Sequence, residues 1–230
     1  TATTAGGGLY SFAVCPGNYI VEVIPANFNS GSPLYDNTLM AALVSSPIGG
    51  APDPDNDADN DDNGDPVSGF GVASAAITMA YNTEPDGADM NTNNRLDFGF
   101  KTPTTVTINN VTLAEGTGAG PTAFNFTVTR SDDDEAFSLT VNTAGGTATS
   151  GTDFTAISGG TVSFAANDNN TTATVTVDVA HDNIVENNET FTVNLSGAPA
   201  GVVITDGTGD GTINNDDAAT VTLSGNASQA

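Results

Sequence analysis

One stretch of the chain reads Ala173-Thr174-Val175-Thr176-Val177-Asp178-Val179, with apolar and polar side chains in alternation. A period of two predicts a β-strand that buries one face and exposes the other to water. Four more stretches keep this period between clusters of Gly, Asn and Asp that are typical of turns; they span residues 106–108, 124–129, 137–141 and 191–195. Short alternating strands between turn clusters predict an all-β protein built as a β-sandwich.

The charge of the chain is almost entirely negative. Its 230 residues include 28 Asp or Glu against 3 Lys or Arg, which gives a formal net charge of -25. Such a surface repels phosphate groups, so the sequence excludes nucleic acid as a partner. No run of 18 apolar residues occurs, and we expect no insertion into a membrane. Low hydrophobicity with high net charge is also typical of disorder, so a folded state requires something that neutralises the acids.

The strand signal is weaker in residues 1–101. We expect strands at residues 10–12, 19–24 and 77–81, with a turn at residues 16–18. Cys15, the one cysteine, lies in an apolar run. This setting predicts a buried small hydrophobic side chain, and a disulfide bond to another chain is the alternative.

Five ordered motifs occur between residues 104 and 217. They are Leu113-Ala114-Glu115-Gly116, the stretch from Gly146 to Phe154 (GTATSGTDF), Gly160-Thr161-Val162-Ser163-Phe164, the stretch from His181 to Phe191 (HDNIVENNETF) and the stretch from Gly211 to Asp217 (GTINNDD). This part of the chain resembles a Calx-β domain along its whole length. The resemblance implies a seven-stranded immunoglobulin-like sandwich with Ca²⁺ at one end, as in the sodium–calcium exchanger and in bacterial surface proteins.

The resemblance also implies a set of calcium ligands. Ca²⁺ takes six to eight oxygen ligands at about 2.3–2.6 Å, and clustered carboxylates raise one another's pKa unless a cation lies among them. A solvated acidic rim without a metal is the alternative. The implied ligands come from three separate stretches of the chain: Glu115; Asp182, Glu186 and Glu189; Asp216 and Asp217.

Three positions depart from the family pattern. Gly145 and Asn215 stand where the family often has an acid, and His181 stands where an acid often begins the loop. Fewer charges weaken a calcium site, so we expect one or two ions rather than a larger cluster. Asp153 is expected to hydrogen-bond within its own turn.

Residues 1–101 resemble the second half of an SdrD B-like (collagen-adhesin B-type) repeat. The matching pieces are 8–12, 16–21, the Asp-rich tract that ends at Asn63-Gly64, Glu84-Pro85 and 96–100. The family opens with strands that are missing here, and an unpaired sheet edge is a liability. The fold expected for the chain is therefore two tandem immunoglobulin-like sandwiches over 1–101 and 102–217, the first without its opening strands, followed by an extra strand over 218–230.

The Asp-rich tract at 53–65 offers a second candidate calcium site. Its spacing, with Gly64 at the turn position, follows the first half of an EF-type loop. The twelfth position is Phe70 rather than Glu, so a helix–loop–helix is not implied, and a solvated acidic loop is the alternative. The candidate ligands are Asp59, Asp61, Asn63 and Asp65, with Asp55 and Asp57 as alternates.

The last residues of the chain repeat an earlier pattern. Ala219-Thr220-Val221-Thr222-Leu223 echoes Thr105-Val106-Thr107-Ile108. Residues 218–230 therefore begin a further module, or they pair with a neighbouring copy by head-to-tail β-strand addition, which builds an open filament. The simpler alternative is that the chain is a slice of a longer repeat protein.

The sequence does not favour an enzyme. His181 is the one histidine, no Gly-x-Ser-x-Gly elbow occurs, and a Cys/His zinc set is missing. Our first hypothesis is a calcium-stabilised structural segment or filament subunit of a bacterial surface or secreted protein. The second is an adhesin module that binds a sugar, a protein, ice or a mineral. Both place the chain outside the cell.

Overall fold

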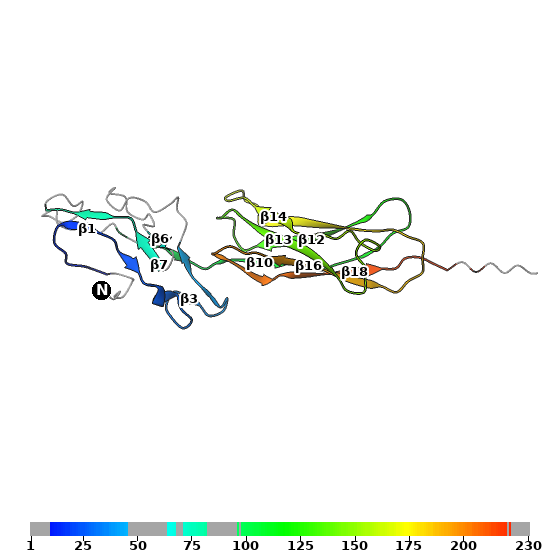
Figure 1. The fold of residues 1–230 in the computed structure, drawn as a ribbon, viewed down its shortest axis with the longest axis horizontal. Helices are drawn as coiled ribbons and strands as arrows, with labels where there is room; N and C mark the ends of the chain where they lie inside the picture. Colours follow the sequence, from blue (N-terminus) through cyan, green and yellow to red (C-terminus); the bar gives the residue numbers. More distant parts are fainter. Residues whose placement is uncertain are drawn as a thin grey trace, which may run out of the picture. The chain divides into compact units, whose positions relative to one another are not determined.

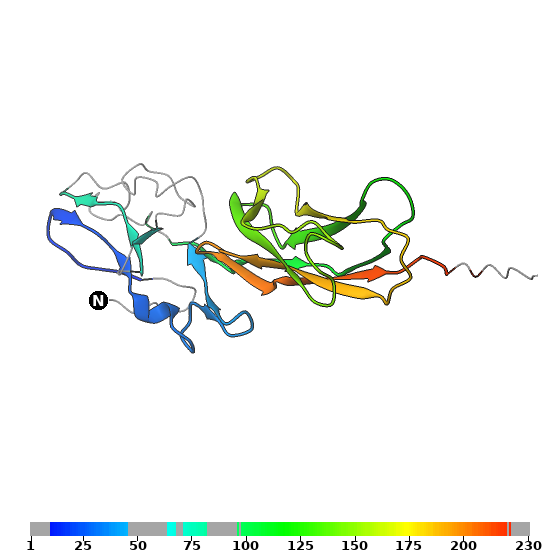
Figure 2. The same cartoon turned by 45° about the vertical axis from the view of Figure 1, so that its right-hand side comes forward.

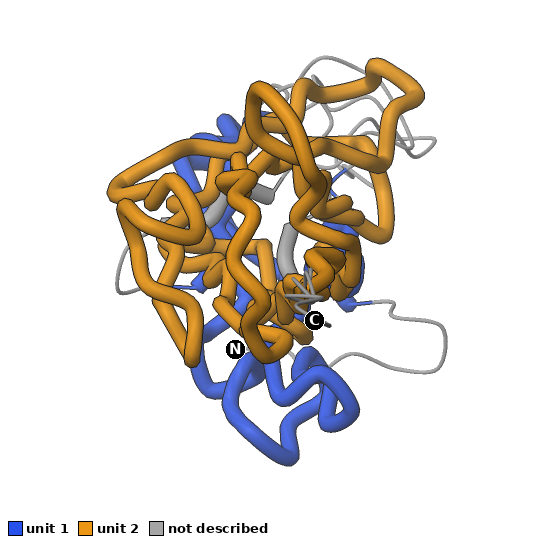
Figure 3. The backbone as a smooth tube through the Cα atoms, turned by 90° about the vertical axis from the view of Figure 1, so that its right-hand side faces the viewer, with its two compact units in different colours: residues 1–103 blue, residues 104–230 orange. Residues whose placement is uncertain are grey.

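The computed structural model describes residues 10–45, 64–67, 71–81, 96, 98–219 and 221. The chain divides into two compact units, Thr1–Pro103 and Thr104–Ala230 (Figure 3). The described residues form β-strands and one short 3-10 helix, η1 (Pro25–Phe28). None of the described helical structure has the length and apolarity to cross a bilayer.

Unit 2 is a sandwich of two sheets (Figures 1 and 2). The first sheet has the order β15-β12-β10-β17, formed by Thr172–Val179, Thr122–Arg130, Thr104–Ile108 and Val202–Asp206. The second has the order β11-β18-β16-β13-β14, formed by Val111–Ala114, Thr208–Asn214, Glu189–Ser196, Phe137–Gly145 and Gly160–Phe164. The prediction of an all-β, immunoglobulin-like sandwich is confirmed.

Two strands of unit 2 change sheets partway along their length. β10 continues into β11 after Asn109 and Asn110, and β17 continues into β18 after Gly207. The Asn109 side chain accepts a hydrogen bond from the Thr127 amide at 2.6 Å, and Asn110 accepts one from the Asp210 amide at 2.7 Å. These side chains replace ladder partners at the break, as Asn does in turns. The two broken strands run parallel to each other in both sheets.

The core of unit 2 comes from the alternating strands. Phe124, Phe126 and Val128 of β12 are buried, as are the Phe, Leu and Val residues of β13, β15 and β16. The Phe154 and Phe191 rings stack with centroids 4.8 Å apart. A fully buried Phe or Val side chain contributes about 1.5–3 kcal/mol relative to an exposed one. The period of two therefore predicted the buried residues of these strands correctly, whereas Phe154 lies outside the alternating stretches.

A buried cation closes one end of the sandwich. Arg130, the last residue of β12, is 2% exposed and lies with its guanidinium carbon 5.0 Å from the centre of the Phe164 ring. It donates to the carbonyl oxygens of Asn170, Glu135 and Ala165 at 2.6–3.0 Å and to Asp168 at 2.9 Å. These contacts tie residues 131–136 and 165–171 together.

Unit 1 consists of short strands in small sheets. They pair as β1-β8 (Gly17–Tyr19 with Ile77–Met79), β2-β7-β6 (Glu22–Val23, Gly71–Ser74 and Gly64–Val67), β3-β4 (Tyr35–Asp36 with Ala41–Ala42) and β5-β9 (Val44–Ser45 with Phe100–Lys101). Val72, Ala73 and Ile77 are its buried apolar residues among those described.

Three local predictions in unit 1 are wrong. Residues 10–12 are not a strand: the Tyr10 hydroxyl donates to the Leu96 carbonyl at 2.6 Å and its ring packs on Phe12, so side chains rather than a backbone ladder hold this segment. The expected turn at 16–18 is instead the start of β1. Cys15 is exposed rather than buried, because residues 11–16 have no sheet to cover them.

Candidate metal centre

The topology brings two carboxylate stretches to one end of unit 2. β11 and β18 are parallel neighbours, so the C-terminal ends of both strands lie side by side at one end of the sandwich. Glu115 follows β11 and its amide donates to the Asn214 carbonyl at 3.1 Å. Asp216 and Asp217 follow β18 after one residue, Asn215. Parallel pairing of the first and last strands of the sandwich is therefore what places these acids together.

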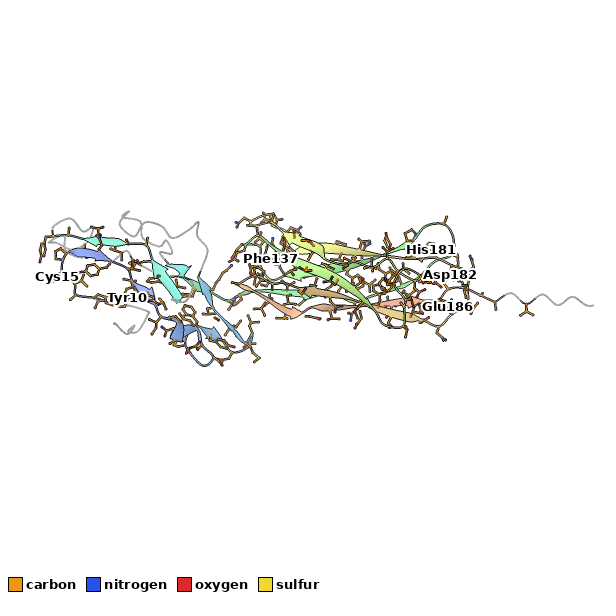
Figure 4. All side chains as sticks on the ribbon, in the orientation of Figure 1. Tyr10, Cys15, Phe137, His181, Asp182 and Glu186 are labelled. Atoms are coloured by element: carbon orange, nitrogen blue, oxygen red, sulfur yellow. The ribbon has the colours of Figure 1, made fainter. Side chains whose placement is uncertain are left out.

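A third stretch joins them from the other sheet. Residues 180–188 connect β15 to β16 and pass from one sheet to the other at this end, where Figure 4 labels His181, Asp182 and Glu186. The Asp182 side chain accepts a hydrogen bond from the Ile184 amide at 2.7 Å. One carboxylate oxygen each of Glu115, Asp182 and Asp217 lie within 4.8 Å of one another. These three residues are called the acidic triad below.

The other expected ligands lie around the triad. Asp216 accepts a hydrogen bond from the Gly116 amide at 3.2 Å, which holds it against the segment of Glu115. The Glu186 amide donates to the Asn215 side chain at 3.0 Å. Glu189, the first residue of β16, interacts most strongly with Asp153.

The triad contains buried oxygen atoms that lack a hydrogen-bond donor. Glu115 is 6% exposed, an unusual position for a carboxylate. Its Oε1 and the Asp217 Oδ2 are buried, and neither has a hydrogen-bond partner among the described residues. A buried polar atom without a partner costs about 1–3 kcal/mol, more if it is charged. The geometry of the triad therefore suits a cation between these oxygens.

The electrostatics of the triad point the same way. Burial raises the pKa of Glu115, and the charges of Asp182, Asp217, Glu186 and Asp216 raise it further. Desolvation also raises the pKa of Asp217, together with the charges of Asp182 and Asp216 and a hydrogen bond with Asp182. Without a cation the cluster holds its charge poorly and tends to bind protons.

Glu189 and Asp153 form a second acidic pair beside the triad. Burial, followed by the charge of Asp153 and a hydrogen bond with it, raises the pKa of Glu189 to about 7. Glu186 and Glu115 add smaller contributions, so this pair belongs to the same electrostatic cluster. Asp153 also accepts a hydrogen bond from the Thr149 amide at 2.6 Å, within its own turn as expected.

The unit has almost no positive charge of its own to neutralise these acids. Arg130 is the one Lys or Arg in residues 104–230. Arg130 lies at the end of β12 that is farther from the triad, and its guanidinium forms an ion pair with Asp168 at 2.9 Å. Neutralisation of the cluster must therefore come from protons or from cations in solution.

Asparagine side chains shape the loops of the site, a role that the sequence analysis did not assign. Besides accepting from Glu186, Asn215 donates to the Asp217 carbonyl at 3.2 Å. Asn188 accepts from the Asn215 amide at 3.1 Å and donates to the Asn214 side chain at 2.9 Å. The asparagines next to the acids in the sequence could have predicted this role, because Asn side chains commonly hydrogen-bond to nearby backbone groups.

The second candidate site lies largely beyond what the structure describes. Asp59, Asp61 and Asn63 fall outside the described residues. Asp65 lies in β6, opposite Ala73 of β7, and its side chain is outside the description. Gly64 is also in this extended strand, which differs from the turn expected there. The EF-type spacing therefore stays a prediction.

Comparison with known proteins gives a family for unit 2. The family model of the Calx-beta domain matches residues 100–222. No curated protein matches the chain. Among solved structures, the apo-form Calx CBD1 domain is 25% identical, with 50% of this chain and 99% of that chain covered and a TM-score of 0.44. CBD12 from CALX1.2 is 26% identical over 49% of this chain and 46% of that chain, with a TM-score of 0.43.

The matched region coincides with the sandwich that holds the acidic triad. Calx-beta domains are calcium-binding β-sandwich modules and not a catalytic family. Residues 1–99 lie outside the match. Since the matched residues make up more than half of the sequence, the chain belongs to the Calx-beta domain family.

Proposed function

We propose that the chain is a calcium-stabilised structural segment of an extracellular repeat protein or filament, with Ca²⁺ bound at the acidic triad. The observation that carries this proposal is the buried Glu115 carboxylate. Its Oε1 has no hydrogen-bond partner among the described residues, and one oxygen of the same carboxylate lies within 4.8 Å of oxygens from Asp182 and Asp217. Oxygens that share one Ca²⁺ ion lie up to about 5 Å apart, because each is about 2.3–2.6 Å from it.

Calcium bound in this way acts as a ligand of the folded state. Asp216 and Glu186, whose charges raise the pKa of Glu115, and Glu189, whose pKa the charge of Glu115 raises, are our candidates to complete the shell or to hold a second ion. A ligand that binds only the folded chain stabilises it by about 2.7 kcal/mol per site at a hundredfold excess over Kd. It also removes repulsion in a chain whose net charge is -25. The role is structural, and we assign no catalytic activity.

We propose an extracellular location on the basis of the kind of site. Extracellular calcium modules bind with a Kd of about 10⁻⁴–10⁻³ M, which suits a site that lacks acids at Gly145 and Asn215. The resemblance of residues 1–101 to an SdrD B-like repeat, a region that the family match does not cover, is our reason to propose a surface or secreted repeat protein of a bacterium. Neighbouring copies or further modules are the partners, and residues 218–230 supply a strand for head-to-tail addition. Ala218, Ala219 and Val221, the described residues of this segment, are exposed and are not part of a strand in the structure.

Calcium titration of the full chain tests the proposal. We expect binding heat in calorimetry and a melting temperature that rises with Ca²⁺ and falls in excess chelator. Glu115→Gln removes one ligand charge with little change in shape, and it should abolish most of the calcium-induced rise. Asp210→Asn, an exposed acid within β18, makes the same charge change and should retain it. Equal melting with calcium and with chelator would refute the proposal.

A further inference from the structure

One edge of the first sheet is long and uncovered. β15 is an edge strand whose single partner in the sheet is β12. Residues 153–155 cover only its last part: Thr155 donates to the Asp178 carbonyl and the Ala180 amide donates to the Asp153 carbonyl, both at 2.8 Å. Within the described part of the chain, no strand pairs with the outer side of residues 172–177.

The ladder geometry identifies the backbone groups that face outward. Thr127 of β12 accepts from the Asn109 amide and donates to the Asn109 side chain, so its backbone groups point toward β10. Thr127 lies opposite Thr174. Thr127 and Thr174 are therefore a non-hydrogen-bonded pair, in which each residue directs its backbone N–H and C=O away from the other. The N–H and C=O of Thr174 thus point outward, away from β12. The Asp178 carbonyl and the Ala180 amide, which bond to residues 153–155 on the outer side, show that the even-numbered residues of this segment direct their backbone groups outward.

The period of two extends this orientation to Thr172 and Thr176. The Thr172 amide already donates to the Asn170 side chain at 3.0 Å. The amides of Thr174 and Thr176 and the carbonyls of all three threonines therefore form an open row of donors and acceptors. Such a row is a template for another extended chain.

This edge lacks the devices that protect β17 and β11, and it is longer than the fourth edge strand of unit 2, the uncharged β14, which has five residues against eight in β15. Residues 172–177 contain no charge and no proline. By contrast, the edge strand β17 pairs irregularly with β10 and ends at Asp206, and the short edge strand β11 runs directly into Glu115. Lysines, acids, bulges and short length are the usual means by which edges avoid pairing. In a chain with a net charge of -25, an uncharged edge is where a like-charged copy meets least repulsion.

We propose that β15 pairs antiparallel with β15 of a second copy, joining two sandwiches into one continuous sheet. The strand suits itself as a partner: apolar residues at 173, 175, 177 and 179 lie on the core side, and threonines occupy the outer face. With the two-fold axis at Thr174 or Val175, Asp178 lies opposite residue 170 or 172, so no acid faces an acid. The contact is isologous and closes as a dimer. It goes beyond the proposed function and does not require the calcium site.

Thr174→Pro tests the pairing with little cost to the monomer, because the lost amide is not part of the ladder with β12 and proline is tolerated on edge strands. By analytical ultracentrifugation at about 0.15 M salt, where surface charges are screened, the wild-type chain of 23.0 kDa should approach twice that mass with increasing concentration. Thr174→Pro should weaken association at least tenfold, and Thr174→Ser, which keeps the amide, should not. A wild-type chain that stays monomeric, or equal association by the proline variant, would overturn the proposal.

Cysteine cross-linking gives a second readout that does not depend on proline. In a Cys15→Ser background, Thr174→Cys and Thr176→Cys chains are oxidised alone and as a mixture. Opposed Cα atoms about 5.5 Å apart fit a disulfide, so a 174–174 bond places the axis at Thr174 and a 174–176 bond places it at Val175. Thr140→Cys, exposed on the interior strand β13, is the control and should stay monomeric. Equal cross-linking by the control would overturn the pairing.

Both measurements are repeated in calcium and in chelator, after calcium binding has been measured separately. If the chain dimerises through Thr174 but binds no Ca²⁺, the proposed function is refuted and the pairing is not. If the chain binds Ca²⁺ but neither dimerises nor cross-links at these positions, the pairing is refuted and the proposed function is not.

Discussion

The Thr122 side-chain oxygen lies 2.8 Å from Nε2 of His181, and the same hydroxyl donates to the Glu115 carbonyl. Since the Thr122 proton is used on the carbonyl, the hydroxyl oxygen accepts from Nε2–H, which assigns the proton of a neutral His181 to Nε2. β12, the segment after β11 and the loop after β15 are thus joined at one point, directly behind the acidic triad.

Replacing Thr122 by Val should lower the stability of unit 2 by about 1–3 kcal/mol, because it keeps the shape but leaves the Glu115 carbonyl and the His181 nitrogen unpaired. Thr122→Ser should recover most of the loss. Urea unfolding followed by circular dichroism measures both variants. A Val variant as stable as wild type would mean that water replaces the hydroxyl without cost.

Gly116 is next to this junction and has a φ of +96°. A Cβ at this position would lie 2.8 Å from Nε2 of His181, whereas one at Gly120, with a φ of +104°, would meet nothing within 4 Å. Both alanine variants carry the backbone strain, about 1 kcal/mol or more. Gly116→Ala should be destabilised further and should bind Ca²⁺ more weakly, because the clash displaces Glu115. Melting and calorimetry of the two variants side by side separate the clash from the strain.

The sequence predicts the strands of unit 2 well but not how they meet. Alternation marks which residues of β12, β13, β15 and β16 are buried, since burial on one face is a local property. It does not indicate that β11 and β18 are parallel, although this pairing brings Gly116 and Asp216, separated by 100 residues, within hydrogen-bond distance. The ligand set came from resemblance to a family, which encodes that long-range pairing.

The errors in unit 1 have a related cause. Its strands are two to four residues long, too short for a period of two to be distinguished from chance. Tyr10 and Phe12 alternate with Ser11 as a strand would, yet aromatic contacts and the bond to Leu96 hold them outside any sheet. The sheet breaks at Asn109 and Asn110 were missed for a different reason, because Asn marks turns generally and not a strand that crosses between sheets.

Arg130 should be the most costly polar residue of unit 2 to replace. Arg130→Met fills similar volume but leaves the carbonyls of Asn170, Glu135 and Ala165 without their donor, and we expect a loss of about 3–5 kcal/mol. Asp168→Asn touches only the partly exposed end of the network and should cost under about 1 kcal/mol. Urea denaturation of both variants tests the ranking. A larger loss from Asp168→Asn would show that the ion pair, and not the carbonyl bonds, holds the two loops.

The raised pKa values predict a distinctive pH dependence. Glu189 has a folded pKa of about 7 against an ordinary value of 4.5, so between these values the folded chain binds more protons than the unfolded chain. Without calcium, stability should therefore fall as pH rises from about 4.5 to 7, and Glu115 and Asp217, whose pKa values are also raised, add to the same trend. Melting temperatures in chelator across this range measure the slope.

Saturating calcium should reverse that slope, because the ion stabilises the ionised carboxylates and protons compete with it. Glu189→Gln should flatten the slope in chelator, since it removes the carboxyl group whose pKa is raised to about 7, whereas Asp210→Asn, whose side chain is exposed, should leave it unchanged. Calorimetric affinity for Ca²⁺ should also fall as pH decreases below 7. An apo protein that gains stability as pH rises from 4.5 to 7 would show that these carboxylates are already neutralised in the folded chain by another group.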